Sequence, residues 1–213
     1  MRRLPVYLLL DTSGSMCGEP IEAVKNGVQT LVSALRQDPY ALETAHLSVI
    51  TFSNKAQQVV PLSELPQFQL PNIQASGGTS MGEALALVAQ RRDAEVVKST
   101  TEVKGDWKPL VFLMTDGEPT DNFDRGVTEF QKRKWGMVIA CAAGPSANTE
   151  KLKKLTESVV QLDVADSAAF KAFFKWVSAS VSASSKSVES TGKEVTGLDQ
   201  LPPPPPEINV VGV

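Results

Sequence analysis

The chain contains little cysteine and almost no histidine. Its 213 residues include two cysteines, Cys17 and Cys141, and one histidine, His46. The two cysteines lie far apart and in no metal-ligand spacing, which argues against a disulfide scaffold and fits a reducing cytosol. A Ser-His-Asp triad would have to use His46, which we expect to open a strand away from the polar loops described below.

A strong excess of charge and long apolar runs are also lacking. The formal net charge is -3, and the basic residues are scattered apart from one small cluster at residues 132–134, which argues against a nucleic-acid-binding surface. No run reaches the roughly 20 apolar residues of a membrane helix. The apolar run that follows Met1 stops at Asp11, short of the core of a signal peptide. We therefore expect a cytoplasmic protein that binds neither nucleic acid nor membrane.

Apolar runs typical of buried strands alternate along the chain with stretches of helical spacing. The predicted strands are residues 4–10, 47–52, 56–62, 110–114, 137–142 and 159–162, of which 56–62 is the weakest and resembles an edge strand. The predicted helices cover residues 20–38, 81–88, the stretch before Lys134, 151–155 and 170–181. This alternation predicts an α/β fold with a doubly wound, mostly parallel central sheet flanked by helices.

The composition changes after Val181. Serine and small residues lead into five consecutive prolines, Pro202–Pro206, which favour an extended polyproline II conformation without a core of its own. We therefore expect one domain over residues 1–183 and an extended or disordered tail over residues 184–213. A linker is the simpler interpretation of the tail, and a ligand for a proline-binding module is the alternative.

Sheets of α/β proteins bind ligands at the carboxyl ends of their strands. Three polar loops are expected at this edge of the sheet. One follows the first strand, a second opens a helix after Gly77-Gly78, and the third follows the strand 110–114. Together they carry five oxygen-bearing side chains, which are the candidate metal ligands: Asp11, Ser13, Ser15, Thr79 and Asp116. Oxygen ligands suit hard divalent cations, of which we favour Mg²⁺ over Mn²⁺ or Ca²⁺. Glu118 and Asp121 of the third loop are interpreted as solvated loop or helix-start acids.

Charge and coordination number suggest what such a site does. Two ionised aspartates balance the charge of a divalent cation, and five side chains leave one position of an octahedron open. A neutralised cation with an open position favours an incoming carboxylate, so we expect a partner protein that supplies an Asp or Glu ligand.

Two other interpretations of the site stay open. It could belong to a Mg²⁺-dependent phosphohydrolase that uses Asp11 or Asp116, or it could be a structural site whose metal only holds the loops. Against catalysis, the chain has no Gly-rich phosphate loop, and Ser13 stands where a nucleophilic Asp11 would want a second acid. We therefore favour a binding module with no catalytic residues.

The segments 11–16 (DTSGSM), 77–80 (GGTS) and 115–121 (TDGEPTD), in this order, resemble the metal-ion-dependent adhesion site (MIDAS) of von Willebrand factor A (vWA) domains. The resemblance covers residues 4–181. It implies that Ser13 and Ser15 bind the metal directly, that Asp11 and Asp116 act directly or through water, and that Thr79 switches with ligand state. It also implies one antiparallel edge strand in the sheet.

The start RRLPVYLLLDTSGSM and the segment LMTDGEPTD are closer still to bacterial TerY-type proteins, which are associated with tellurium resistance. That resemblance implies a small cytoplasmic vWA protein in stress signalling, with a phosphatase or a kinase-like protein as partner.

Overall fold

A seven-stranded sheet in the order β3-β2-β1-β4-β5-β6-β7 forms the centre of the fold. The structure is a computed structural model that describes residues 2–211. The strands are β1 (Leu4–Asp11), β2 (Ala45–Phe52), β3 (Ala56–Glu64), β4 (Leu110–Thr115), β5 (Met137–Ala143), β6 (Val159–Leu162) and β7 (Ile208–Val210). The five inner strands are parallel, and β3 and β7 run antiparallel to their neighbours. The mostly parallel sheet is thus confirmed, with two antiparallel edge strands where one was expected.

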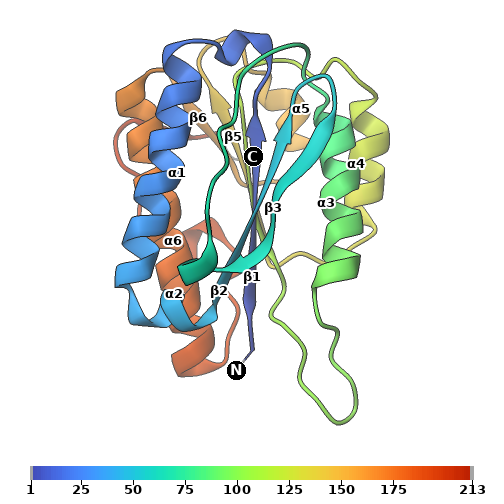
Figure 1. The fold of residues 1–213 in the computed structure, drawn as a ribbon, viewed down its shortest axis with the longest axis vertical. Coiled ribbons are helices and arrows are strands. Elements are labelled where there is room, and N and C mark those ends of the chain that lie inside the picture. Colours follow the sequence, from blue (N-terminus) through green and yellow to red (C-terminus); the bar gives the residue numbers. More distant parts are fainter. Residues whose placement is uncertain (1, 212–213) are drawn as a thin grey trace.

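Helices cover both faces of the sheet (Figure 1). One face carries α1 (Glu19–Gln37), α2 (Pro39–Thr44) and α6 (Ser167–Thr191), and the other carries α3 (Met81–Glu95), α4 (Phe123–Gln131) and α5 (Thr149–Lys153). Short 3-10 turns occur at Gly14–Met16, Leu65–Gln67 and Leu198–Gln200. No helix among residues 2–211 is long and apolar enough to cross a membrane.

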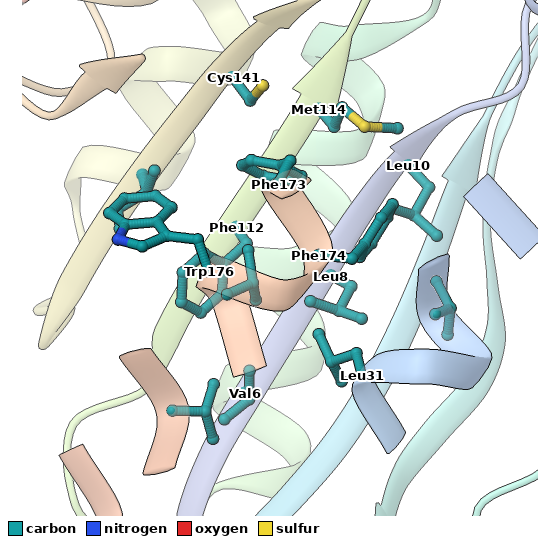
Figure 2. Packing of buried hydrophobic residues seen from close by; sticks show 14 of the residues in the cluster. Val6, Leu8, Leu10, Leu31, Phe112, Met114, Cys141, Phe173, Phe174 and Trp176 are labelled. Atoms are coloured by element: carbon teal, nitrogen blue, oxygen red, sulfur yellow. The ribbon is translucent and has the colours of Figure 1, made fainter. Parts of the chain in front are cut away.

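Each layer of helices buries one side of β1, which explains the continuous apolar run of this strand. Leu8 and Leu10 belong to the core beneath α1 and α6, whereas Tyr7 and Leu9 belong to the core beneath α3 and α4. Figure 2 shows Phe174 of α6 among these side chains of the first core. Because both faces are covered, every residue of β1 is buried and the strand is fixed at the centre of the sheet.

The last helix extends beyond the predicted domain boundary. α6 continues to Thr191, although its second half is rich in serine, a residue of modest helix propensity. Ser184, Ser185 and Val188 are buried, and α6 packs against both α1 and α2. Tertiary packing therefore carries the helix past Val181, where the sequence predicts its end, and past the predicted domain boundary at residue 183.

The segment after α6 returns to the sheet instead of leaving the domain. Leu201 and Ile208 are buried, and the indole Nε1 of Trp176 donates to the carbonyl oxygen of Pro202 at 2.8 Å. β7 then pairs with β6 and closes the edge of the sheet. The sequence predicts an extended or disordered tail over residues 184–213. Up to residue 211, the last described residue, the segment instead packs on the domain and joins its sheet. Single, widely spaced apolar residues make these contacts, so no periodic pattern in the sequence predicts the contacts.

The contact between α1 and α6 provides a test of the packing. A Cβ atom added at Gly27 of α1 would lie 2.1 Å from Cδ2 of Phe174, which is fully buried. Glycine-to-alanine changes inside helices usually stabilise by about 1 kcal/mol. We expect Gly27→Ala to destabilise the protein instead, because the core has no room for the methyl group. The free energy of unfolding should fall by about 1–3 kcal/mol. Urea denaturation measures the difference.

Asn26→Ala is the matched control for this prediction, since Asn26 is the exposed neighbour of Gly27 on the same helix. The control should be neutral or slightly stabilising. A Gly27→Ala protein as stable as the control would contradict the close approach of α1 and α6.

Candidate metal site

The first and third polar loops meet because β1 and β4 are adjacent parallel strands. Leu10 pairs with Met114, so Asp11 at the end of β1 lies beside Thr115 at the end of β4. The hydroxyl of Thr115 donates to Oδ2 of Asp11 at 2.6 Å. Asp116 is the next residue, and the register of the two strands therefore brings both aspartates to the carboxyl edge of the sheet.

The loop between β1 and α1 turns its two serines toward Asp116. The backbone N–H of Ser13 donates to Oδ1 of Asp11 at 2.8 Å, which tightens the start of the loop. Oγ of Ser13 and Oγ of Ser15 lie 3.0 Å apart, and Oγ of Ser15 donates to Oδ1 of Asp116 at 2.7 Å. The side-chain oxygens of Ser13, Ser15 and Asp116 thus form one hydrogen-bonded chain, and Asp11 joins it through the backbone N–H of Ser13.

The second loop reaches the same place through its glycines. The backbone N–H of Gly14 donates to the carbonyl oxygen of Gly77 at 2.9 Å, which ties the first loop to the second. Gly77 has a φ of 75°, and a Cβ there would lie 2.5 Å from the Asn54 side chain. Only glycine fits this backbone conformation without strain, and it lets the loop approach closely.

Thr79, the fifth predicted side chain, lies beside the Asp116 loop. Its Oγ1 is 4.0 Å from the position that a Cβ at Gly117 would take, and its side chain is buried. The structure therefore places all five predicted residues on three loops that contact one another. Among residues 2–211 no three His, Cys, Asp or Glu side chains gather as a metal cluster. A site here would depend on hydroxyl groups for three of its five ligands.

Asp11 carries the main electrostatic cost of the site. Burial raises the pKa of Asp11, while hydrogen bonds from Ser13 and Thr115 act against this rise. The negative charge of nearby Asp116 raises the pKa further. A cation between the two carboxylates would offset both the burial and the repulsion. The donor set of hydroxyls and carboxylates fits a hard divalent cation.

The residues that hold the three loops in place escaped the sequence interpretation. Oδ1 of Asn54 accepts from the backbone N–H of Gly78 at 2.8 Å, and Oγ1 of Thr120 accepts from that of Thr79 at 2.8 Å. Asp121, interpreted as a solvated acid, caps the first turn of α3. No spacing rule links residues so far apart in the chain, so only their polar character within a loop could have drawn attention to them.

Other charged or reactive side chains lie apart from this cluster or are engaged elsewhere. Glu118 forms an ion pair with Lys151 and accepts from the side chain of Asn148. His46 lies near the amino end of β2, which is the opposite edge of the sheet because β2 runs parallel to β1. Its ring nitrogen lies 3.2 Å from the carbonyl oxygen of Thr44. The histidine is therefore away from the site loops, as the sequence predicts.

Solved structures of other proteins share this fold. The von Willebrand factor type A protein of Catenulispora acidiphila matches 85% of this chain with a TM-score of 0.64 and 16% identity. Proximal thread matrix protein 1 of the mussel byssus, with a zinc-occupied MIDAS motif, matches 84% with a TM-score of 0.63 and 19% identity. At these identities the likeness establishes the fold alone.

Similarity in sequence extends to one uncharacterized protein of Synechocystis sp. It is 36% identical over 124 residues, which cover 55% of this chain and 26% of that protein. The chain spans less than half the length of each of these three proteins, with 43% and 48% of the two solved chains covered.

The family model described as von Willebrand factor type A domain matches residues 6–175. This range contains all three loops and every strand from β1 to β6 except the first residues of β1. With the matching sheet topology and helix layers, the chain belongs to the von Willebrand factor type A domain family.

Proposed function

We propose that this chain is a metal-dependent protein-binding module. In this proposal a divalent cation is held by Asp11, Ser13, Ser15, Thr79 and Asp116 and takes a carboxylate from a partner protein. The observation that carries the proposal is the contact between the first and third loops. Oγ of Ser15 lies 2.7 Å from Asp116 and 3.0 Å from Oγ of Ser13, so three oxygen atoms already face one another.

Mg²⁺ is the cation that this donor set favours, with Mn²⁺ and Ca²⁺ as the next candidates. Hard cations prefer oxygen ligands, and Mg²⁺ keeps an octahedral shell in which water fills the positions that the protein leaves open. The zinc-occupied MIDAS motif of the mussel byssus protein supports a divalent cation at this place in the fold. Competition between Mg²⁺ and Zn²⁺ for the wild-type protein would rank the two.

The incoming partner ligand is proposed to be an Asp or Glu side chain. The two aspartates balance the charge of the cation, and a charged oxygen competes with water for the vacant position. A catalytic role would require a general base within hydrogen-bond reach of the bound ligand. The chain's single histidine lies at the opposite edge of the sheet and is out of reach for this role, so we favour binding over phosphoester hydrolysis.

The biological setting forms a further part of the proposal. The motifs that resemble TerY-type proteins suggest a cytoplasmic role in a bacterial tellurium-resistance or stress-signalling system. A phosphatase or a kinase-like protein would then be the partner that supplies the carboxylate.

Cation binding should stabilise the fold. We expect Mg²⁺ to raise the Tm of the wild-type protein, because a ligand at 100 times its Kd adds about 2.7 kcal/mol to the free energy of unfolding. Ser13→Ala and Asp116→Ala should remove most of this increase, whereas Ser33→Ala on the exposed face of α1 should keep it. Differential scanning calorimetry with Mg²⁺ and with a chelator measures each case. An identical Tm with and without Mg²⁺, Mn²⁺ or Ca²⁺ would contradict the proposal that the chain binds a divalent cation.

The buried carboxylate of Asp11 gives a pH-dependent prediction for the metal-free protein. Its pKa is raised on folding, so its protonated form stabilises the fold at low pH, and this contribution is lost as the pH rises through the raised pKa. Asn at this position resembles the neutral form and could still accept from Ser13 and donate to Thr115. In a chelator at neutral pH, we therefore expect Asp11→Asn to melt at a higher temperature than the wild type.

The difference in melting temperature between Asp11→Asn and the wild type should shrink as the pH falls to about 4, the ordinary pKa of aspartate. Circular dichroism melting curves across this pH range provide the measurement. Glu43→Gln, which changes an exposed carboxylate, serves as the control and should follow the wild type. A metal-free Asp11→Asn protein that melts below the wild type at neutral pH would contradict the electrostatic cost assigned to Asp11.

Partner capture should depend on the metal. In a pull-down from a bacterial host lysate, we expect Mg²⁺ to support capture and a chelator to abolish it. Thr79→Ala should weaken capture while its circular dichroism spectrum stays native-like. Loss of the charged contact between the partner carboxylate and the metal, as in the chelator, should cost about 2–5 kcal/mol. Equal capture in the chelator would argue against the module. Mg²⁺-dependent turnover of phosphoesters that is lost in Asp11→Ala would favour the phosphohydrolase instead.

A further inference from the structure

Thr79 is held on both sides of its backbone by a single residue of the Asp116 loop. The N–H of Thr79 donates to Oγ1 of Thr120 at 2.8 Å, and the carbonyl oxygen of Thr79 accepts from the N–H of Thr120 at 3.0 Å. Thr79 lies before Ser80, the N-cap residue of α3, so its N–H has no acceptor within the helix. The hydroxyl of Thr120 therefore fills a role that no element of regular structure provides.

The next residue of the same loop caps α3. Oδ1 of Asp121 accepts from the N–H of Gly82 at 3.0 Å, and Oδ2 accepts from the N–H of Glu83 at 2.7 Å. These groups belong to the first turn of a helix, where N–H groups lack intrahelical partners and carry partial positive charge. Ser80, the residue at the N-cap position, makes no capping hydrogen bond of its own. The cap of α3 thus comes from a loop about forty residues further along the chain.

Close packing between α3 and α4 fixes the two loops relative to each other. A Cβ at Gly82 would lie 2.5 Å from the carbonyl oxygen of Asn122, and a Cβ at Gly126 would lie 2.3 Å from that of Gly82. Backbone thus packs on backbone beside the caps. The start of α3 and the Asp116 loop are consequently packed and hydrogen-bonded to each other.

We propose that Thr120 and Asp121 are positioning residues that set the metal affinity of the site without binding the metal. They would hold Thr79 at its distance from Asp116, whose neighbour Gly117 faces the Thr79 hydroxyl. This inference rests on the proposed function, because it assumes that Thr79 is a metal ligand. Loss of the Thr120 hydroxyl would leave the N–H of Thr79 unpaired, and the Thr79 side chain would no longer be held beside the metal site.

Two substitutions at Thr120 test the contribution of the hydroxyl group separately from that of the methyl group. Thr120→Val keeps the shape and removes the acceptor, whereas Thr120→Ser keeps the acceptor and removes the methyl group. By titration calorimetry with MgCl₂, we expect Thr120→Val to weaken Mg²⁺ binding by about three- to tenfold, the range expected for one hydrogen bond. Thr120→Ser should stay within about twofold of the wild type. Thr128→Val, which removes an exposed hydroxyl on α4, is the matched control.

A measurement without metal tests the same contacts independently. Amide hydrogen exchange by NMR in a chelator should be faster at Thr79 in Thr120→Val. It should be faster at Gly82 or Glu83 in Asp121→Asn, because an amide keeps only one of the two acceptor oxygens. Asp121→Asn should also weaken Mg²⁺ binding, and it keeps the test available if Thr120→Val does not fold.

The outcomes distinguish this inference from the function on which it rests. If the wild type binds Mg²⁺ and Thr120→Val binds it equally well, the positioning role is wrong and the metal site stands. Equal losses in Thr120→Val and Thr120→Ser would also overturn it, since the hydroxyl would then not be the cause. If the wild type binds no divalent cation, both proposals fall together.

Discussion

The parallel pairing of β1 with β4 is the contact on which the candidate site depends. Residues at the ends of adjacent parallel strands emerge at the same edge of a sheet, and here the register sets Asp11 beside Thr115. The 2.6 Å hydrogen bond between these side chains locks the last residues of the two strands together. A shift of the register by one residue would turn the side chains to opposite faces and separate Asp11 from Asp116.

The apolar layers on both sides of the sheet hold this register. β1 is buried along its whole length, with alternate side chains beneath α1 and α6 on one face and beneath α3 and α4 on the other. Glycines at the helix contacts, such as Gly27 against Phe174, allow these helices to approach closely. The polar loops therefore start from fixed points, and short hydrogen-bonded turns are sufficient to bring their oxygen atoms together.

The site combines this rigid framework with an electrostatic strain that a cation would relieve. Asp11 is buried close to a second carboxylate, and protein donors compensate its charge only in part. Hydroxyl ligands would add no further charge, so two aspartates would match one divalent cation and leave a position available to a charged ligand. This balance is the physical basis of our proposal that the domain binds a partner through a metal ion.

The sequence by itself determined the alternation of strands and helices and the five candidate ligands. The first follows from apolar periodicity, and the second from three polar segments in the order of the family motif. Local patterns also indicated that His46 lies away from the site, because a strand separates it from the loops.

Only the tertiary structure decided the course of the chain after residue 183, where Leu201 and Ile208 are too widely spaced to form a pattern. It likewise decided which residues hold Thr79 in place. Thr120 and Asp121 act across about forty residues of sequence, and hydrogen bonds between distant loops leave no periodic trace in a chain because they depend on how the helices pack.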